Sequence, residues 1–573
     1  MTEVAASAVR FADGVNNSLT NHGNVTTAAG AAGTAISGTG GNEVIDNFGI
    51  ITGAVDLGTG VNSFHNERDA SFNLGTTVNL GSGNLLTNDG TVAPGGAGNV
   101  MTSSVAGSLA QATTGIYALD VNQATGTADQ LDVSGTASLA GQVRPSSMNS
   151  GYAKPGFHQL TILSGAGGVT QSSLSLDAQP SAVVHYQLLS PDSTHLALGY
   201  SVDFSPVGLN PNQAAIGNYI NNIQLAGSSA AFAPVTAYLF DLPDSHSLAA
   251  AYNRLSPEPH LEPMTGTLFS SIQFSNALHS CGSREGPDRF VRESDCRWGR
   301  ATVTGARQGQ TDSHLGFKRQ ALNVAGGAQR AIGDRTLHLG YGLSLEDSLL
   351  DVGDGLADTS GHQIQGGLVV KKQLGATILA ADVSAGYGAY DSTRVVGVPT
   401  PSVAASSTQH ANFAAGHLRL AHAFEQGGTW YLKPMVDAGA TYARFPDFQE
   451  KGAGGANLDI SSHNETFVTI SPALEAGMER VLADGTLVRP YAKLGATHFL
   501  AGAAPEIVAS FQGAPAGVAP FSVNGDIDKT YADVEAGLDV MGTDRAVVRA
   551  GYVGHYSNTV QSFSATIKLS IPF

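Results

Sequence analysis

The chain has 573 residues, enough for three or more domains, and only 13% of them are charged. Its 71 glycines and short β-branched runs indicate a mostly-β protein with many tight turns. The formal net charge of −18 argues against nucleic acid as a partner, and no run of about 18 apolar residues predicts a transmembrane helix.

Residues 1–98 contain short internal repeats. Val55–Asn62 matches Val78–Asn84, and Ile36–Gly40 is a looser copy. Asparagines recur at a spacing of roughly 19 to 26 residues, the length of one solenoid coil; they are Asn21, Asn47, Asn66 and Asn88. We expect a parallel β-solenoid with glycines at its corners and stacked asparagines that bond turn backbone between coils.

Residues 99–205 alternate more strongly and carry larger side chains. Apolar runs such as Leu131–Val133, Leu160–Leu163 and Leu196–Tyr200 are separated by Gly, Asn, Ser and Pro turns. An open solenoid end would expose core and strand edges, so we expect this segment to form a strand-rich cap.

Residues 206–283 change to helical periodicity. Helices are predicted after Asn210 and over Leu248–Leu255, and Pro257 and Pro259 end the second one. A third helix over 260–280 would be about 30 Å long, close to the thickness of a bilayer core. It is too polar to face lipid and suits a polar barrel lumen; the alternative is a linker helix packed on a soluble domain.

Residues 284–573 alternate with period two, as in Leu337–Glu346 and Ala532–Val540. Short links alternate with longer ones, as in transmembrane barrels, whereas a soluble sandwich would have more crossovers. Counting segments predicts twelve strands. The expected short links are 333–334, 374–375, 426–428, 483–485 and 542–544, and the expected long links are 309–313, 351–361, 391–409, 444–465 and 500–526.

The last twelve residues predict a strand with one apolar face. An uncovered apolar terminal strand would promote aggregation unless it pairs with the first strand and closes a barrel in lipid. Its apolar side chains are Phe563, Ala565, Ile567, Leu569, Ile571 and Phe573.

Charged residues on the opposite faces of the barrel strands would be paired or hydrated in the lumen. They include Lys433, Asp437, Glu475, Arg489, Lys493, Glu535, Asp539 and Arg549. The same topology brings the end of the pore helix to the rim where the first strand begins, so Cys281 and Cys296 become neighbours. We expect a disulfide between them, worth about 3 kcal/mol in the loop-entropy model, with two free thiols or a redox pair as alternatives.

This series of segments resembles the type V (classical) autotransporters of Gram-negative bacteria. The resemblance is strongest in Asn210–Gln213, Leu255–Glu258, Trp298 with Gly299, and the terminal strand. It implies an all-β chain of four domains: a β-solenoid (β-helix) passenger over 1–98, similar to that of pertactin-like proteins; an autochaperone-like cap over 99–205; linker helices and the pore helix over 206–283; and a 12-stranded transmembrane antiparallel β-barrel, with an α-helix through its lumen, over 284–573.

The resemblance also implies location and partners. The barrel would sit in the outer membrane and the passenger at the cell surface, with outer-membrane lipid, the barrel-assembly machinery and periplasmic chaperones as partners of a monomer. Residues Phe563, Ile567, Leu569, Ile571 and Phe573 would form the sorting strand, although Lys568 and Ile571 depart from the usual pattern. The pore helix lacks the Asn-Asn pair of self-cleaving members, so we expect the passenger to stay attached.

The beginning of the chain has no basic start and no apolar h-region, so we expect an export signal upstream of Met1. The leading function is a translocator that displays its own passenger. An adhesin or virulence factor that binds a host surface ligand is the alternative, and a solute channel conflicts with a helix in the lumen.

An enzyme is the weakest reading of the sequence. The motifs Gly-x-Ser-x-Gly, His-Glu-x-x-His and Gly-Asp-Ser-Leu are absent. The amino-terminal histidines stand singly and fit surface or turn positions; they are His22, His65, His158, His185 and His195. We expect no catalysis, no cofactor and no metal.

Overall fold

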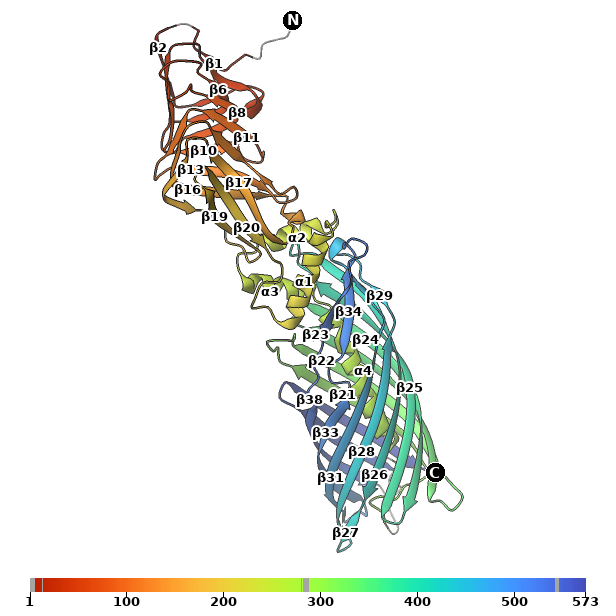
Figure 1. Ribbon diagram of the computed structural model, residues 1–573. Coiled ribbons are helices and arrows are strands. Elements are labelled where there is room, and N and C mark those ends of the chain that lie inside the picture. Colours follow the sequence, from red (N-terminus) through yellow and green to blue (C-terminus); the bar gives the residue numbers. More distant parts are fainter. Residues whose placement is uncertain (1–5, 13, 280, 282–287, 542–545) are drawn as a thin grey trace. The chain divides into compact units, whose positions relative to one another are not determined.

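The computed structural model describes residues 6–12, 14–279, 281, 288–541 and 546–573. It divides into two compact units (Figure 1). The first comprises 1–208, 220–249 and 515–518, and the second comprises 209–219, 250–514 and 519–573. We describe each unit by itself. The four domain boundaries given above remain predictions, and residues 283 and 284 lie outside the described part.

The first unit is built from twenty short strands within the described residues. They are β1 (Val9–Arg10), β2 (Asn16–Asn21), β3 (Asn24–Thr26), β4 (Thr34–Ser37), β5 (Asn42–Asn47), β6 (Ile50–Asp56), β7 (Ser63–Asn66), β8 (Ser71–Asn79), β9 (Leu85–Asn88), β10 (Thr91–Pro94), β11 (Thr102–Ala106), β12 (Ser108–Gln111), β13 (Ile116–Asn122), β14 (Thr127–Ala128), β15 (Gln130–Val133), β16 (Ala137–Met148), β17 (Gly156–Gly165), β18 (Val169–Leu176), β19 (Val184–Asp192) and β20 (His195–Val202).

Equivalent strands of successive coils pair in parallel. Ile36 lies beside Val55, and Val55 beside Val78, so the three repeats stack in register. Inward side chains such as Ile45, Phe64 and Phe72 are buried, while alternate residues face outward. The predicted parallel solenoid is confirmed, because period-two burial and coil-length repeats are both local properties of the sequence.

An asparagine ladder runs along one corner of the solenoid. The Nδ2 atom of Asn21 donates to Asn47 Oδ1 at 2.8 Å, Asn47 donates to Asn66 at 2.8 Å, and Asn66 donates to Asn88 at 2.9 Å. Asn47 Nδ2 also donates to the backbone oxygens of Gly49 and Ser71. The ladder thus satisfies turn backbone groups that the coils would otherwise leave buried and unpaired, as expected.

Later in this unit the pairing becomes partly antiparallel. Strand β20 pairs with both β17 and β19 in antiparallel fashion, whereas β16 still pairs with β18 in parallel. Helices follow along the chain, and α1 and α3 are divided between the two units: α1 (Pro211–Leu225), α2 (Ala233–Phe240) and α3 (Ser245–Leu255). The sequence predicted α1 and α3 but missed α2, because eight residues are too few for a clear helical period.

The second unit contains a closed antiparallel barrel (Figure 1). Its long strands are β21 (Cys296–Gln308), β22 (Phe317–Ile332), β23 (Leu337–Val352), β24 (Ala357–Leu374), β25 (Thr377–Val395), β26 (Ala404–His422), β28 (Trp430–Phe445), β31 (His463–Met478), β33 (Leu487–Ala501), β36 (Thr530–Met541), β37 (Val547–Tyr556) and β38 (Val560–Pro572), with β27 (Phe424–Gln426) and β32 (Arg480–Val481) as short extensions. Among the described residues this makes twelve long strands, as expected, and β21 pairs with β38 to close the ring.

Two expected loops are mostly strand. Strand β23 runs to Val352 and β24 begins at Ala357, so the predicted link 351–361 shrinks to four residues. The link 391–409 likewise shortens to 396–403. Serines, threonines and glycines here suggested a loop. They extend the hairpins instead, since ladder hydrogen bonds do not require an apolar face. The predicted turn 542–544 lies outside the described residues.

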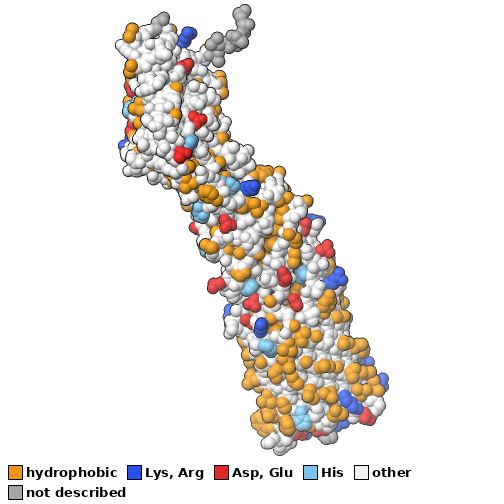
Figure 2. Space-filling view, viewed as in Figure 1, with side chains coloured by type: hydrophobic (Ala, Val, Ile, Leu, Met, Phe, Trp, Pro, Cys, Tyr) orange, Lys and Arg blue, Asp and Glu red, His pale blue; other side chains and the backbone are white. Residues whose placement is uncertain are grey.

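The outer face of the barrel is apolar. Leu343, Leu368, Val383, Leu494 and Ile567 are each more than half exposed although they sit mid-strand. Hydrophobic side chains gather over the barrel in Figure 2. Their alternate neighbours point inward and are buried. A surface of this kind is adapted to lipid rather than to water.

The two longest links carry structure of their own. Strands β29 (Phe448–Gln449), β30 (Leu458–Ile460), β34 (Glu506–Phe511) and β35 (Phe521–Asn524) form a separate four-stranded antiparallel sheet. This sheet was not predicted, because it joins two loops that are about 50 residues apart in sequence. None of the helices in the described part of the chain combines the length and apolar content that a membrane-spanning helix needs.

Candidate functional site

The centre of the barrel is occupied by helix α4 (Glu262–Leu278), which follows the 3₁₀ turn η3 (Glu258–Leu261). Pro263 stands in its first turn, where no backbone N–H is needed. The predicted helix spanned 260–280; its first two residues belong to η3, and Ser280 lies outside the described residues. Apart from Glu262 in its first turn, the helix has no Asp, Glu, Lys or Arg and many small polar residues, so it can pass a polar lining.

Helix α4 contacts strands on several sides of the ring. Ser270 Oγ donates to Glu346 of β23 at 2.9 Å, and Ser275 Oγ donates to Asp382 of β25 at 2.7 Å. Other hydrogen bonds join Ser271 to Thr441 of β28, and Gln273 to Thr304 of β21 and Ser564 of β38. Contacts in so many directions mean that the helix runs inside the lumen, as predicted.

Charged residues that lie opposite one another on neighbouring strands of the lining alternate in sign. On neighbouring strands β28, β31, β33 and β36 the directly opposed residues are Lys433, Glu475, Lys493 and Glu535. Lys433 Nζ lies 2.6 Å from Glu475 Oε1, and Lys493 pairs with Glu535. Cross-strand pairs of opposite charge stabilise a sheet, whereas like charges in this register would repel.

The remaining predicted lumen charges are also paired. Arg419 makes two 2.7 Å bonds to Asp437, and Arg549 Nη2 donates to Asp539 at 2.7 Å. Arg489 pairs with Glu479 at 2.7 Å. Apart from Glu479, these groups line a cavity of about 280 Å³ beside the helix. Pairing lets the lumen hold charge without an uncompensated buried ion.

One end of α4 is tied to the first barrel strand. Cys281 and Cys296 form a disulfide with Cα atoms 6.2 Å apart. Both half-cystines are buried beside Phe274, Leu278 and Trp298. The bond therefore anchors the end of the helix where β21 begins.

The other end is held by Glu450, which follows β29. Its Oε1 lies 2.9 Å from His260 Nε2 and accepts a 2.9 Å bond from Arg394 Nε. Its Oε2 accepts the Leu458 N–H at 2.9 Å. Glu450, Arg394 and His260 are each about 1% exposed. This buried cluster joins strand β25, a long loop and the turn before the helix.

A second carboxylate, Glu258, fixes the same turn to another loop. Its Oε1 accepts the Leu315 N–H at 2.6 Å, and Asn212 Nδ2 donates to its Oε2 at 3.3 Å. Asn212 Nδ2 also donates to Asn524 O at 2.9 Å. The chain before α4 is therefore held by loops at the end of the barrel that carries the long links.

The terminal strand lies where the sequence predicted. Its apolar side chains face outward and are between 43% and 63% exposed; they are Phe563, Ile567, Leu569, Ile571 and Phe573. The Phe563 ring lies over Gly305, where an added Cβ would approach it to 2.7 Å. The Arg297 guanidinium lies 5.3 Å from the Phe573 ring centroid. Whether this face is a sorting signal remains a prediction.

Sequence reasoning missed Glu450, Arg394 and His260. Each is a single ionisable residue near a strand end or turn, and they are separated by more than 50 residues. The sequence could have indicated Glu258, because this residue ends the segment Leu255–Glu258 that carried part of the family resemblance.

A closed barrel with an apolar outside, a charged lining and an internal helix defines an outer-membrane β-barrel protein. Residues 297–553 match the family model of the autotransporter beta-domain. This segment, which contains most of the barrel, is therefore similar to the autotransporter beta-domain.

Solved structures are similar to about half of the chain. The translocator domain of autotransporter NalP from Neisseria meningitidis is 13% identical, with a TM-score of 0.43 over 55% of this chain and 98% of that one. The beta domain of the Bordetella autotransporter BrkA is 14% identical, with a TM-score of 0.37 over 49% and 100%. The transport unit of AIDA-I from Escherichia coli is 10% identical, with a TM-score of 0.34 over 48% and 90%. No curated protein matches the chain.

Proposed function

We propose that the barrel displays the amino-terminal solenoid of its own chain at the cell surface and keeps it attached there. The observation that carries this proposal is the direction of α4. Its carboxyl end is bonded to the start of β21 through Cys281 and Cys296, and the turn before it is held by the long loops through Glu258 and Glu450.

The orientation of the barrel supports the outward direction. Outer-membrane barrels keep short turns on the periplasmic side and longer loops outside. The short turns at 333–336 and 375–376 lie at the strand ends opposite the long links. The chain that precedes the helix then leaves the lumen on the outer side.

Surface labelling of intact cells tests this proposal. The chain would be produced behind an export signal and probed with antibodies against residues 6–205. We expect labelling before permeabilisation, together with a single denatured band near the full 58.6 kDa. Labelling that requires permeabilisation would contradict display, and a released amino-terminal fragment would contradict attachment.

A binding role for the displayed solenoid is a second candidate. Several apolar side chains point outward from its strands and corners: Val44, Phe48, Ile50, Val61 and Leu85 are 40–75% exposed. Exposed apolar side chains in a polar surface suit contact with a partner. Adhesion of producing cells to a host-cell layer would test this role, and replacing Val44 and Leu85 with serine should lower adhesion while display is unchanged.

A further inference from the structure

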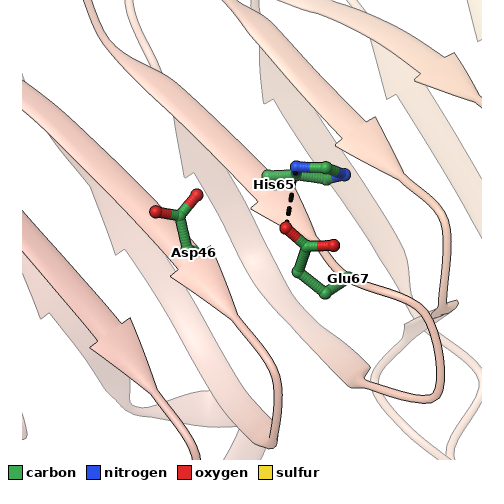
Figure 3. Close-up of side chains that lie close together, drawn as sticks. All are labelled: Asp46, His65 and Glu67. Carbon is green, nitrogen blue, oxygen red and sulfur yellow. Dashed lines mark ion pairs between the residues drawn. The ribbon is translucent and has the colours of Figure 1, made fainter.

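The outer face of the solenoid brings one imidazole and three carboxylates together. Asp46 of β5 and His65 of β7 lie side by side in the parallel ladder, and Glu67 follows β7 in the next turn (Figure 3). Each offers one ligand atom, and these atoms lie within 4.8 Å of one another. Asp89, which follows β9, reaches the same imidazole from the next coil.

The backbone holds the two flanking carboxylates in equivalent places. The N–H of Glu67 donates to Asn47 O at 2.9 Å, and the N–H of Asp89 donates to Asn66 O at 2.8 Å. Both residues therefore follow a rung of the asparagine ladder, one coil apart. His65 stands on β7, just before the turn that carries Glu67. Strand β7 pairs with β9, which leads to Asp89, so the imidazole can reach both acids.

The two imidazole nitrogens have different surroundings. Nε2 lies 2.7 Å from Asp89 Oδ2, and Nδ1 lies 3.1 Å from Glu67 Oε1. If Nε2–H donates to Asp89, the lone pair of Nδ1 points toward Glu67, and a cation could be bound by both of these atoms.

We propose that Asp46, His65 and Glu67 bind a divalent transition-metal cation, with Asp89 as the residue that positions the imidazole. At ligand distances of about 2.0–2.2 Å, adjacent ligand atoms lie roughly 3–3.5 Å apart, which matches the pair of Nδ1 and Glu67 Oε1. A carboxylate on the second nitrogen of a ligating histidine is the usual outer-sphere arrangement.

Charge favours a divalent cation at this place. Three carboxylates surround one imidazole, so the cluster has an excess of acidic groups. In the part of the chain that the structure describes, no lysine or arginine forms an ion pair with these three acids. A nitrogen ligand beside carboxylates suits zinc, manganese or nickel better than calcium or magnesium, which prefer oxygen alone.

The bound ion would join two consecutive coils directly, because Asp46 stands on β5 and His65 on the neighbouring β7. Asp89, which follows β9, would connect the next coil through its contact with the imidazole. Because the ion binds the folded arrangement and not the unfolded chain, it should stabilise the solenoid in proportion to its concentration.

Calorimetric titration of the full-length protein in detergent with zinc chloride tests the site. We expect the wild type to bind one more equivalent than His65→Gln, and zinc to raise the unfolding temperature of the wild type only. Asp46→Asn should weaken affinity at least about tenfold, and Asp89→Ala by about 10–100-fold with unchanged stoichiometry, as for other outer-sphere ligands.

His195→Gln is the matched control, because His195 is an outward histidine with a carboxylate from Asp192 at 2.9 Å. Its zinc binding should equal that of the wild type. Circular dichroism would verify that each variant is folded. Equal zinc binding by His65→Gln and the wild type, or an equal loss in His195→Gln, would overturn the proposal and leave a simple ion pair at His65.

Discussion

At the residue scale, two buried carboxylates hold the turn that precedes α4. Glu450 and Glu258 each accept hydrogen bonds from two different parts of the chain, including one backbone N–H. A buried carboxylate is tolerated because every partner is a donor or a cation. These two residues therefore connect the long links to the turn before α4.

Replacing Glu450 with glutamine should destabilise the barrel by about 3–5 kcal/mol, because the Arg394 charge stays buried without its partner. Denaturant unfolding followed by heat-modifiable gel migration would measure the loss. Glu425→Gln is the matched control, since Glu425 is exposed on β27. A stability equal to that of the control would show that the cluster does not hold the loops.

The disulfide is the other residue-scale anchor. In the loop-entropy model a bridge that closes 15 residues is worth about 3 kcal/mol. We expect Cys281→Ser with Cys296→Ser to lower stability by about that amount and to abolish any response to reductant. If the wild type unfolds at the same denaturant concentration with and without reductant, the bridge contributes nothing measurable.

At the element scale, the turn between β14 and β15 carries a buried acid. Burial raises the pKa of Asp129 to about 7, and the neighbouring Asp120 adds to the rise, although N–H groups of Asp120 and Met101 oppose it. The folded pKa exceeds the ordinary value near 3.8. The favourable contribution of the protonated acid is therefore complete below about pH 4 and is lost as the pH rises to about 7.

Urea unfolding of the first unit as a function of pH tests this predicted loss of stability with rising pH. The wild type should lose stability relative to Asp129→Asn between about pH 4 and pH 7, because the variant has no proton to release there. Parallel profiles for the two proteins across that range would contradict the raised pKa.

The elements also show what local sequence can predict. The repeats around Val55 and Val78 and the alternation of β38 predict solenoid and barrel, because coil length and period two are properties of short segments. The sheet of β29, β30, β34 and β35 could not be predicted in this way, since its strands are two to six residues long and pair across two loops.

The candidate sites show the same difference between what local patterns predict and what depends on contacts between distant segments. The lumen charges were predicted as a set, because each stands on the polar face of a strand. Their partners depend on strand register, which the sequence alone does not give. Glu450 and Arg394 meet only after the barrel closes, and His65 meets Asp46 only after two coils stack.

At the scale of the whole molecule, one chain supplies a membrane barrel, the helix that fills it and a solenoid. The apolar outer face suits a lipid environment, and the polar helix contacts the charged lining of the lumen. A channel function conflicts with this arrangement, because α4 and its contacts occupy the path that a solute would take.

Planar-bilayer conductance of the purified protein tests this central claim most directly. The wild type should pass little current, whereas deletion of Glu262–Leu278 should open a large, stable conductance while heat-modifiable migration still reports a folded barrel. Equal conductance in the two folded proteins would contradict a lumen filled by the helix.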